Sequence, residues 1–190
     1  MKVSCLIGSP RPQSNSAAIA ARFTETAAKL GAQIETTVLN KLKYWGCQGC
    51  MACKTQSDEC VVQDDLAQVL ESLKEADVVV LALPVYCSDV PGQVKCFIDR
   101  TYSYMPPNFM EGAPSRMPAG KKLVYIVTQG APVETMFADV ATKYPEFFKR
   151  SMGFSEAYVI RGVGVGGGGT VGVPDQYLNQ AEDLARTLIK

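Results

Sequence analysis

Short runs of apolar residues alternate with helical patterns along the whole chain, and this alternation constrains the fold most strongly. The clearest strand is predicted over 77–83, where DVVVLAL is apolar and β-branched, as expected of a strand buried on both faces. The other strands are expected at 2–8, 33–39, 122–128 and 157–165, and the helices at 16–30, 91–104, 133–149, 175–189 and from Asp64-Asp65 onward. Five β-α units predict one α/β domain over 1–190, with a five-stranded parallel sheet in the order 2-1-3-4-5 and helices on both faces.

The loop after the first strand is rich in polar side chains. Ligands of such sheets bind outside the carboxyl ends of the strands. The loop reads GSPRPQSNS, and its donors are Ser9, Arg11, Ser14, Asn15 and Ser16. The amides that open the next helix favour an anion at the same place. The Ser/Asn cluster would also serve as an ordinary helix cap. With Arg11 included, the pattern favours a monophosphate site, because it lacks the Gly-Lys-Ser/Thr ending of an ATP-binding loop.

The loops after the third and fourth strands meet the same edge of the predicted sheet. Their residues are Pro84, Val85, Tyr86 and Cys87 in one loop and Thr128, Gln129 and Gly130 in the other. Tyr86 offers an aromatic face to a flat ring. Backbone amides near Val85 and Gly130 are candidate donors to the polar edge of such a ring. Taken singly, Pro84 and Gly130 have a simpler interpretation as strand ends.

Three motifs together resemble the NADPH-dependent FMN reductase branch of the flavodoxin-like superfamily. They are G-S-x-R-x-x-S-N-S, then P-V-Y, then K-x-F-x-D-R at 95–100. The resemblance implies a flavodoxin-like fold and an FMN cofactor. It implies that Ser9, Arg11, Ser14, Asn15 and Ser16 bind the FMN phosphate, and that Pro84, Val85, Tyr86, Thr128, Gln129 and Gly130 flank the ring. Cys87 departs from the motif, either as a thiol beside the flavin or as a small apolar filler.

A cysteine loop at 47–60 is the second candidate site. Its sequence, CQGCMACKTQSDEC, has the spacing C-x2-C-x2-C-x6-C, formed by Cys47, Cys50, Cys53 and Cys60. Such closely spaced thiolates are suited to an iron–sulfur cluster. Zinc fits the spacing less well, and a thiol switch or simple loop packing remains open. The spacing resembles that of the iron–sulfur flavoproteins, which implies one [4Fe-4S] cluster exchanging electrons between ferredoxin and FMN. Cys5 and Cys96 are expected to be buried core thiols.

Composition excludes several classes of function. The chain has no histidine, which excludes Ser-His and Cys-His catalysis and histidine-liganded metals. Nineteen basic residues balance nineteen acidic ones, so neither nucleic acid nor an anionic membrane is an expected partner. The same neutrality speaks against an acidic, flavodoxin-type electron carrier, and a thiol redox sensor is a further alternative. A cytoplasmic location is expected, because the N-terminal apolar run is too short for an export signal.

The resemblance adds expectations about partners. It implies NAD(P)H or ferredoxin as electron donor, a small-molecule acceptor such as a quinone, azo compound or flavin, and a homodimer or homotetramer. Trp45 is expected in packing or a subunit contact. The Gly-rich segment 164–169 fits the dinucleotide pattern only weakly and is expected to be a flexible loop at the rim of the site.

Overall fold

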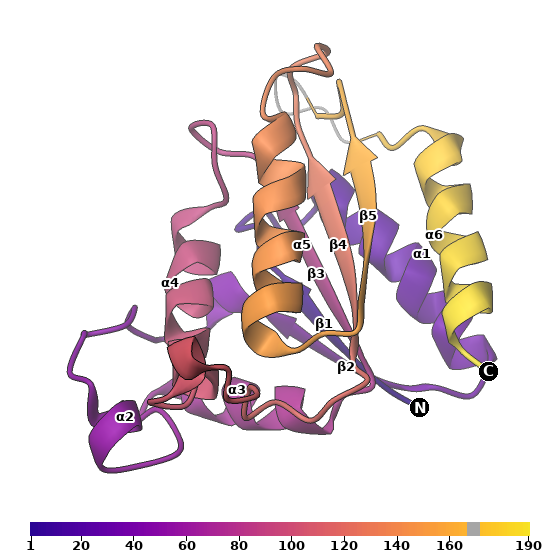
Figure 1. The fold of residues 1–190 in the computed structure, drawn as a ribbon. Coiled ribbons are helices and arrows are strands. Elements are labelled where there is room, and N and C mark those ends of the chain that lie inside the picture. Colours follow the sequence, from indigo (N-terminus) through magenta and orange to yellow (C-terminus); the bar gives the residue numbers. More distant parts are fainter. Residues whose placement is uncertain (167–171) are drawn as a thin grey trace.

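The computed structural model describes residues 1–166 and 172–190, and its centre is one parallel sheet (Figure 1). The strands are β1 (Lys2–Ile7), β2 (Gln33–Val38), β3 (Val78–Pro84), β4 (Lys122–Thr128) and β5 (Glu156–Gly162). They pair in the order β2-β1-β3-β4-β5, with every neighbouring pair parallel. The predicted fold and strand order are therefore confirmed.

Helices cover both faces of the sheet and bury two separate apolar layers. One layer lies under α3 (Asp65–Glu75), α4 (Gly92–Arg100) and α5 (Ala138–Met152), and the other under α1 (Asn15–Lys29) and α6 (Asp175–Leu188). Side chains along β3 alternate between the layers, with Val79, Leu81 and Leu83 in the first and Val78, Val80 and Ala82 in the second. This two-sided burial explains why β3 is a continuous apolar run in the sequence.

Shorter helical turns interrupt the connections. They are α2 (Ala52–Thr55) inside the cysteine loop, and the 3₁₀ turns η1 (Leu39–Lys41), η2 (Thr101–Tyr104) and η3 (Phe109–Glu111). In Figure 1 the cysteine loop and α2 lie beside α3 and the end of α4, away from the carboxyl ends of the strands. None of the helices in the part of the chain described by the structure is long and apolar enough to cross a bilayer.

Several predicted boundaries were wrong. The last strand ends at Gly162 instead of 165, and the 91–104 helix divides into α4 and η2. The 133–149 helix begins only at Ala138, because Phe137 has a φ of +60° and the helix cannot extend back through it. Met136, which precedes the start of this helix, is 44% exposed as a result.

The two cysteines expected in the core have different outcomes. Cys5 on β1 is buried, as predicted, and its burial raises the pKa of the thiol to about 12. Cys96 on α4 is only partly buried, so that prediction was wrong. Of the Gly-rich segment at 164–169, residues 167–169 lie outside the described residues.

Candidate functional site

A cleft lies at the carboxyl edge of the sheet, where the loops after β1, β3 and β4 meet. Its empty space, including the open mouth, is about 470 Å³. From the predicted set, the residues that line it are Ser9, Arg11, Ser14, Asn15, Ser16, Pro84, Val85, Tyr86, Thr128 and Gly130. Cys87 and Gln129 do not line it. Gln13, Val165 and Gly166 also line it and were missed, although the place of β5 beside β4 points to the last two.

At Gly8 the first loop leaves the sheet and passes close to β3 and α4. The Gly8 N–H donates to Ala82 O at 2.7 Å, and its carbonyl accepts from Gln93 Nε2 at 3.0 Å. A Cβ atom at this position would lie 2.3 Å from Val94 Cγ2, which is closer than any real contact. Glycine is therefore required by this close approach to α4.

Two serines of the first loop have hydrogen bonds within the loop itself. Ser14 is the N-cap of α1, and its Oγ accepts from Ala17 N at 3.3 Å. Ser9 is fully buried, and its Oγ accepts from Arg11 N, also at 3.3 Å. Arg11 itself is exposed at the rim. For Ser14 the capping interpretation is thus correct, since its oxygen satisfies an amide that the helix leaves without a partner.

Ser16 has no such local explanation. Its side chain is fully buried in the first turn of α1, and its Oγ has no hydrogen-bond partner among the described residues. A buried hydroxyl without a partner is costly, so ordered water or a ligand is the expected partner. Its neighbour Asn15 is also buried and accepts from Gly172 N at 3.0 Å. Ser16 therefore points to a polar ligand at the N-terminus of α1.

The loop after β3 forms a tight turn beside the cleft. Tyr86 and Asp89 exchange backbone hydrogen bonds of 2.8 and 3.0 Å, and Cys87 and Ser88 between them have φ values of +47° and +67°. These dihedrals place Cys87 at the exposed tip of the turn, which is why it does not line the cleft. The Val85 N–H donates to Thr128 O at 2.8 Å, so it is not available as a donor to a ring.

Asp89 fixes this turn to α5. Its carboxylate accepts from Lys143 Nζ at 2.9 Å and Tyr144 Oη at 2.8 Å. Burial alone would raise the pKa of Asp89, but the hydrogen bonds from Lys143, Tyr144 and the Val90 N–H hold it below its ordinary value. The turn is thus held by an ionised carboxylate at neutral pH.

Gln129 and Arg161 organise the loop after β4. Gln129 is 2% exposed, and its Nε2 donates to Ala131 O and Val133 O within the loop. Arg161, near the end of β5, donates from Nε and Nη2 to Gln129 Oε1 and from Nη2 to the carbonyls of Glu134 and Met136. The Gln129 side chain therefore shapes the loop from within, and sequence reasoning missed Arg161 altogether.

Replacing Arg161 with methionine should loosen this loop. The change removes four hydrogen bonds at a partly exposed position, and we expect the free energy of unfolding to fall by about 1–3 kcal/mol. Urea unfolding measures the loss, and faster hydrogen exchange at residues 130–137 locates it. Arg150→Met, at an exposed position on α5, is the matched control. If the free energy of unfolding falls equally in both variants, the hydrogen bonds of Arg161 make no specific contribution to stability.

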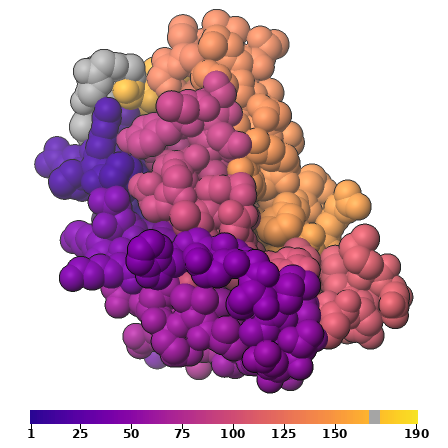
Figure 2. All heavy atoms as spheres, turned by 90° about the vertical axis from the view of Figure 1, so that its left-hand side faces the viewer, coloured from indigo at the N-terminus to yellow at the C-terminus, as the bar shows by residue number. Residues whose placement is uncertain are grey.

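A second pocket surrounds the cysteine loop. Cys47, Cys50, Cys53 and Cys60 all line it, and its empty space is about 440 Å³. Cys47 and Cys50 are exposed, Cys53 and Cys60 are partly buried, and all four are free thiols. Figure 2 shows the segment around residue 50 spread across the outer face of the molecule. Within residues 1–166 and 172–190, no three cysteine or acidic side chains converge to hold a single metal ion.

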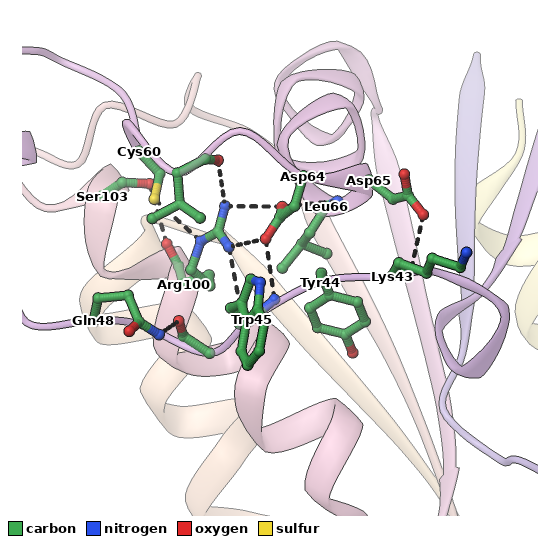
Figure 3. Close-up of polar contacts among 12 residues, drawn as sticks. Lys43, Tyr44, Trp45, Gln48, Cys60, Asp64, Asp65, Leu66, Arg100 and Ser103 are labelled. Carbon is green, nitrogen blue, oxygen red and sulfur yellow. Dashed lines mark hydrogen bonds and ion pairs between the residues drawn. The ribbon is translucent and has the colours of Figure 1, made fainter.

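Arg100 fastens the cysteine loop to the end of α4 (Figure 3). Its side chain is fully buried and forms an ion pair with Asp64, at 2.7 Å from Nη1 to Oδ2 and 3.2 Å from Nη2 to Oδ1. It also donates to Trp45 O and Val62 O, both at 3.0 Å, and from Nε to Cys60 Sγ at 3.1 Å. One side chain therefore holds the segments that precede and follow the cysteines.

Asp64 begins α3 and also accepts hydrogen bonds from Arg100 and from the backbone of Trp45. As predicted it is a helix start, because its Oδ1 accepts from Leu66 N at 3.1 Å. Its burial alone would raise the pKa of the carboxyl, but hydrogen bonds from Arg100 and the Trp45 N–H keep it below the ordinary value. The ring of Trp45, by contrast, is not packed within this chain, since the residue is 71% exposed.

Two further cations bind backbone carbonyls around the same loop. Lys54 Nζ lies 3.8 Å from the centre of the Tyr102 ring and donates to Tyr102 O and Met105 O. Arg116 donates to Cys53 O at 2.8 Å and Ser103 O at 2.9 Å. Arg116, unlike Arg100, contacts only oxygen atoms among the described residues. Burial lowers the pKa of Lys54, and nearby Cys53 opposes this.

The helix α4 connects the two candidate sites. Gln93 in its first turn bonds the first loop of the cleft, and Arg100 at its last residue bonds Cys60. At 1.5 Å of rise per residue, the helix separates these contacts by roughly 10 Å along its axis.

The chain resembles known proteins in sequence. The model of a family described as NADPH-dependent FMN reductase matches residues 1–143. An iron-sulfur flavoprotein of Methanosarcina thermophila is 33% identical over 109 residues, which are 57% of this chain and 56% of that protein. An FMN-dependent NADH:quinone oxidoreductase of Azospirillum brasilense is 31% identical over 141 residues, 69% of this chain and 63% of that protein. The matched segment thus spans about half the length of the first of these relatives.

Solved structures share the fold. An FMN-dependent NADH-azoreductase from Bacillus anthracis, in complex with FMN, superposes with a TM-score of 0.77 over 100% of both chains at 17% identity. An NAD(P)H:quinone oxidoreductase from Methanothermobacter marburgensis gives a TM-score of 0.69 at 20% identity, over 98% of this chain and 94% of the other. At these identities the likeness establishes the fold alone.

Proposed function

Because the chain belongs to the NADPH-dependent FMN reductase family, we propose that it is an oxidoreductase that binds FMN in the cleft at the carboxyl edge of its sheet. The single observation that supports this most is the buried hydroxyl of Ser16, which has no partner among the described residues and lies in the first turn of α1. A phosphate oxygen at the N-terminus of a helix supplies the missing partner.

The residues of the cleft suit the two ends of FMN. Ser16, the loop amides and the exposed Arg11 would hold the phosphate, together with Ser9, Ser14 and Asn15. Pro84, Val85, Tyr86, Thr128 and Gly130 would flank the ring. Gln129 would affect the ring only by shaping the loop after β4. Cys87 would not contact the FMN, because it does not line the cleft. Bound FMN supplies a ring that accepts a hydride or single electrons, which requires no histidine from the chain.

We further propose that Cys47, Cys50, Cys53 and Cys60 hold a [4Fe-4S] cluster that exchanges electrons with FMN. Four free thiols line one pocket, and three cations contact the surrounding segments. A four-iron cluster has the size of a small ligand, so its thiolates stand around a volume and do not meet at one ion. The support for a cluster is therefore the spacing of the four cysteines and the pocket that they line together. Such a cluster supplies one-electron transfer.

A second candidate is a cluster-free enzyme that passes electrons from NAD(P)H to a quinone or azo compound. It is favoured by the likeness to an FMN-dependent NADH:quinone oxidoreductase, which covers more of this chain than the iron-sulfur flavoprotein does. In that case the four cysteines would act as thiols only. The electron donor is then NADH or NADPH, whereas the cluster-bearing form would also accept ferredoxin.

Anaerobic purification followed by absorption spectroscopy and iron and flavin analysis tests both forms. We expect flavin bands, a broad shoulder from iron–sulfur charge transfer, and about four irons per FMN. Flavin without iron, even after reconstitution with iron and sulfide, would favour the cluster-free enzyme, and NAD(P)H turnover with quinones would then identify it. A protein that binds no FMN when FMN is added would refute the proposed function.

A further inference from the structure

Every N–H of the Arg100 guanidinium is directed at an acceptor. The group has five N–H bonds. Two go to the Asp64 carboxylate, one each to the carbonyls of Trp45 and Val62, and the one on Nε goes to Cys60 Sγ at 3.1 Å. Figure 3 shows the guanidinium enclosed by these partners. Four of these acceptors are oxygen atoms, and the fifth is the sulfur of a cysteine in the proposed cluster site.

The sulfur contact suits a charged acceptor. A neutral thiol accepts hydrogen bonds weakly, whereas a thiolate accepts a charge-assisted bond from a cation. The Arg100 side chain is fully buried, so water does not compete for its Nε–H. The pair with Asp64 also orients the guanidinium plane, which aims Nε at the one cysteine that follows the three closely spaced ones.

We infer that Arg100 is a positioning residue for the cysteine site: its Nε–H fixes the sulfur of Cys60 and raises the reduction potential of a cluster bound there. This inference rests on the proposed function. Hydrogen bonds to cluster sulfurs stabilise the reduced state, which carries one more negative charge, and so raise the potential. Nothing in the sequence pattern assigns this role, since Arg100 appears there only as the end of a helix motif.

A pair of charge-preserving variants separates this role from simple anchoring. In Arg100→Lys, a methylene takes the place of Nε, so the bond to Cys60 is lost while a cation remains beside Asp64. Arg116→Lys is the matched control, because Arg116 also fastens the loop as a guanidinium but bonds only the carbonyls of Cys53 and Ser103 and the carboxylate of Asp58. Both changes weaken anchoring and keep the charge. Only the first removes a donor to sulfur.

The measurements are iron per chain and a redox titration of the purified, iron-loaded protein. We expect Arg100→Lys to lower the equilibrium constant for cluster reduction about tenfold, which is about 59 mV for one electron, and Arg116→Lys to leave it at the wild-type value. If Arg100→Lys does not fold, as judged by circular dichroism and FMN content, the neutral pair Arg100→Met with Asp64→Asn replaces it. Asparagine preserves the cap of α3, and no buried charge is left alone.

The outcomes separate the inference from the function beneath it. If the wild-type protein binds iron and the cluster has the same reduction potential in Arg100→Lys as in Arg116→Lys, the inference is overturned. The proposed function would then still stand. Wild type that binds FMN but no iron would overturn the cluster and this role of Arg100 together. A lowered potential in Arg100→Lys alone supports the inference, because an anchoring role without the sulfur contact would affect both variants.

Discussion

Replacing Cys50 with alanine should reduce the iron content from about four atoms per chain to less than one, while FMN stays bound. The four thiols line a single pocket, so removing one leaves a cubane cluster with an open corner. We expect the proposed FMN cleft to be unaffected, because it is built from other loops at the carboxyl edge of the sheet. Iron and flavin assays on the anaerobically purified variant measure both quantities.

The control for this change is Cys96→Ala. Cys96 is a partly buried thiol on α4 and does not line the cysteine pocket. We expect the Cys96→Ala variant to retain iron and FMN at wild-type levels. Full iron retention in Cys50→Ala would contradict the assignment of the four cysteines, and equal iron loss in both variants would indicate a general loss of stability.

Replacing Ser16 with aspartate should weaken FMN binding about a hundredfold or more. The substitution removes a hydroxyl donor and introduces a buried carboxylate where we propose that the phosphate binds, so two anions would face each other. The milder Ser16→Ala removes only the donor and should cost about tenfold in Kd. Quenching of FMN fluorescence during titration of the flavin-free protein gives the Kd of each variant.

The matched control places the same charge in another helix. Gln68 is exposed near the start of α3 and does not line the cleft, so Gln68→Asp should leave the Kd unchanged. If Ser16→Asp binds FMN with the wild-type Kd, the proposal that the phosphate binds at the N-terminus of α1 is contradicted. Circular dichroism checks that the aspartate, which is a residue suited to a first helical turn, has not unfolded the chain.

The sequence predicted the sheet and the place of the cleft well, because both depend on local patterns. The run of residues 77–83 could only be a strand buried on both faces, and its neighbours in sequence fixed the parallel order. The serines of the first loop followed from the same topology, since a ligand site at the end of the first strand is a property of the fold.

What the sequence did not predict depends on contacts between distant segments. Arg161 is 32 residues from Gln129, and Arg100 is 40 residues from Cys60. A long cation shows no pattern that reveals which carbonyls or sulfur it will bind. The start of α5 was missed for a related reason, because the left-handed conformation of Phe137 is imposed by its surroundings and not by its side chain.

The connection of both candidate sites through α4 also restricts how this chain can evolve. Inserting or deleting one residue between Gln93 and Arg100 would rotate one end of the helix by about 100° against the other and shift it by about 1.5 Å. The contacts of Gln93 with Gly8 and of Arg100 with Cys60 would then no longer form together. Descendants that keep both sites are therefore expected to accumulate substitutions in α4 while its length stays constant.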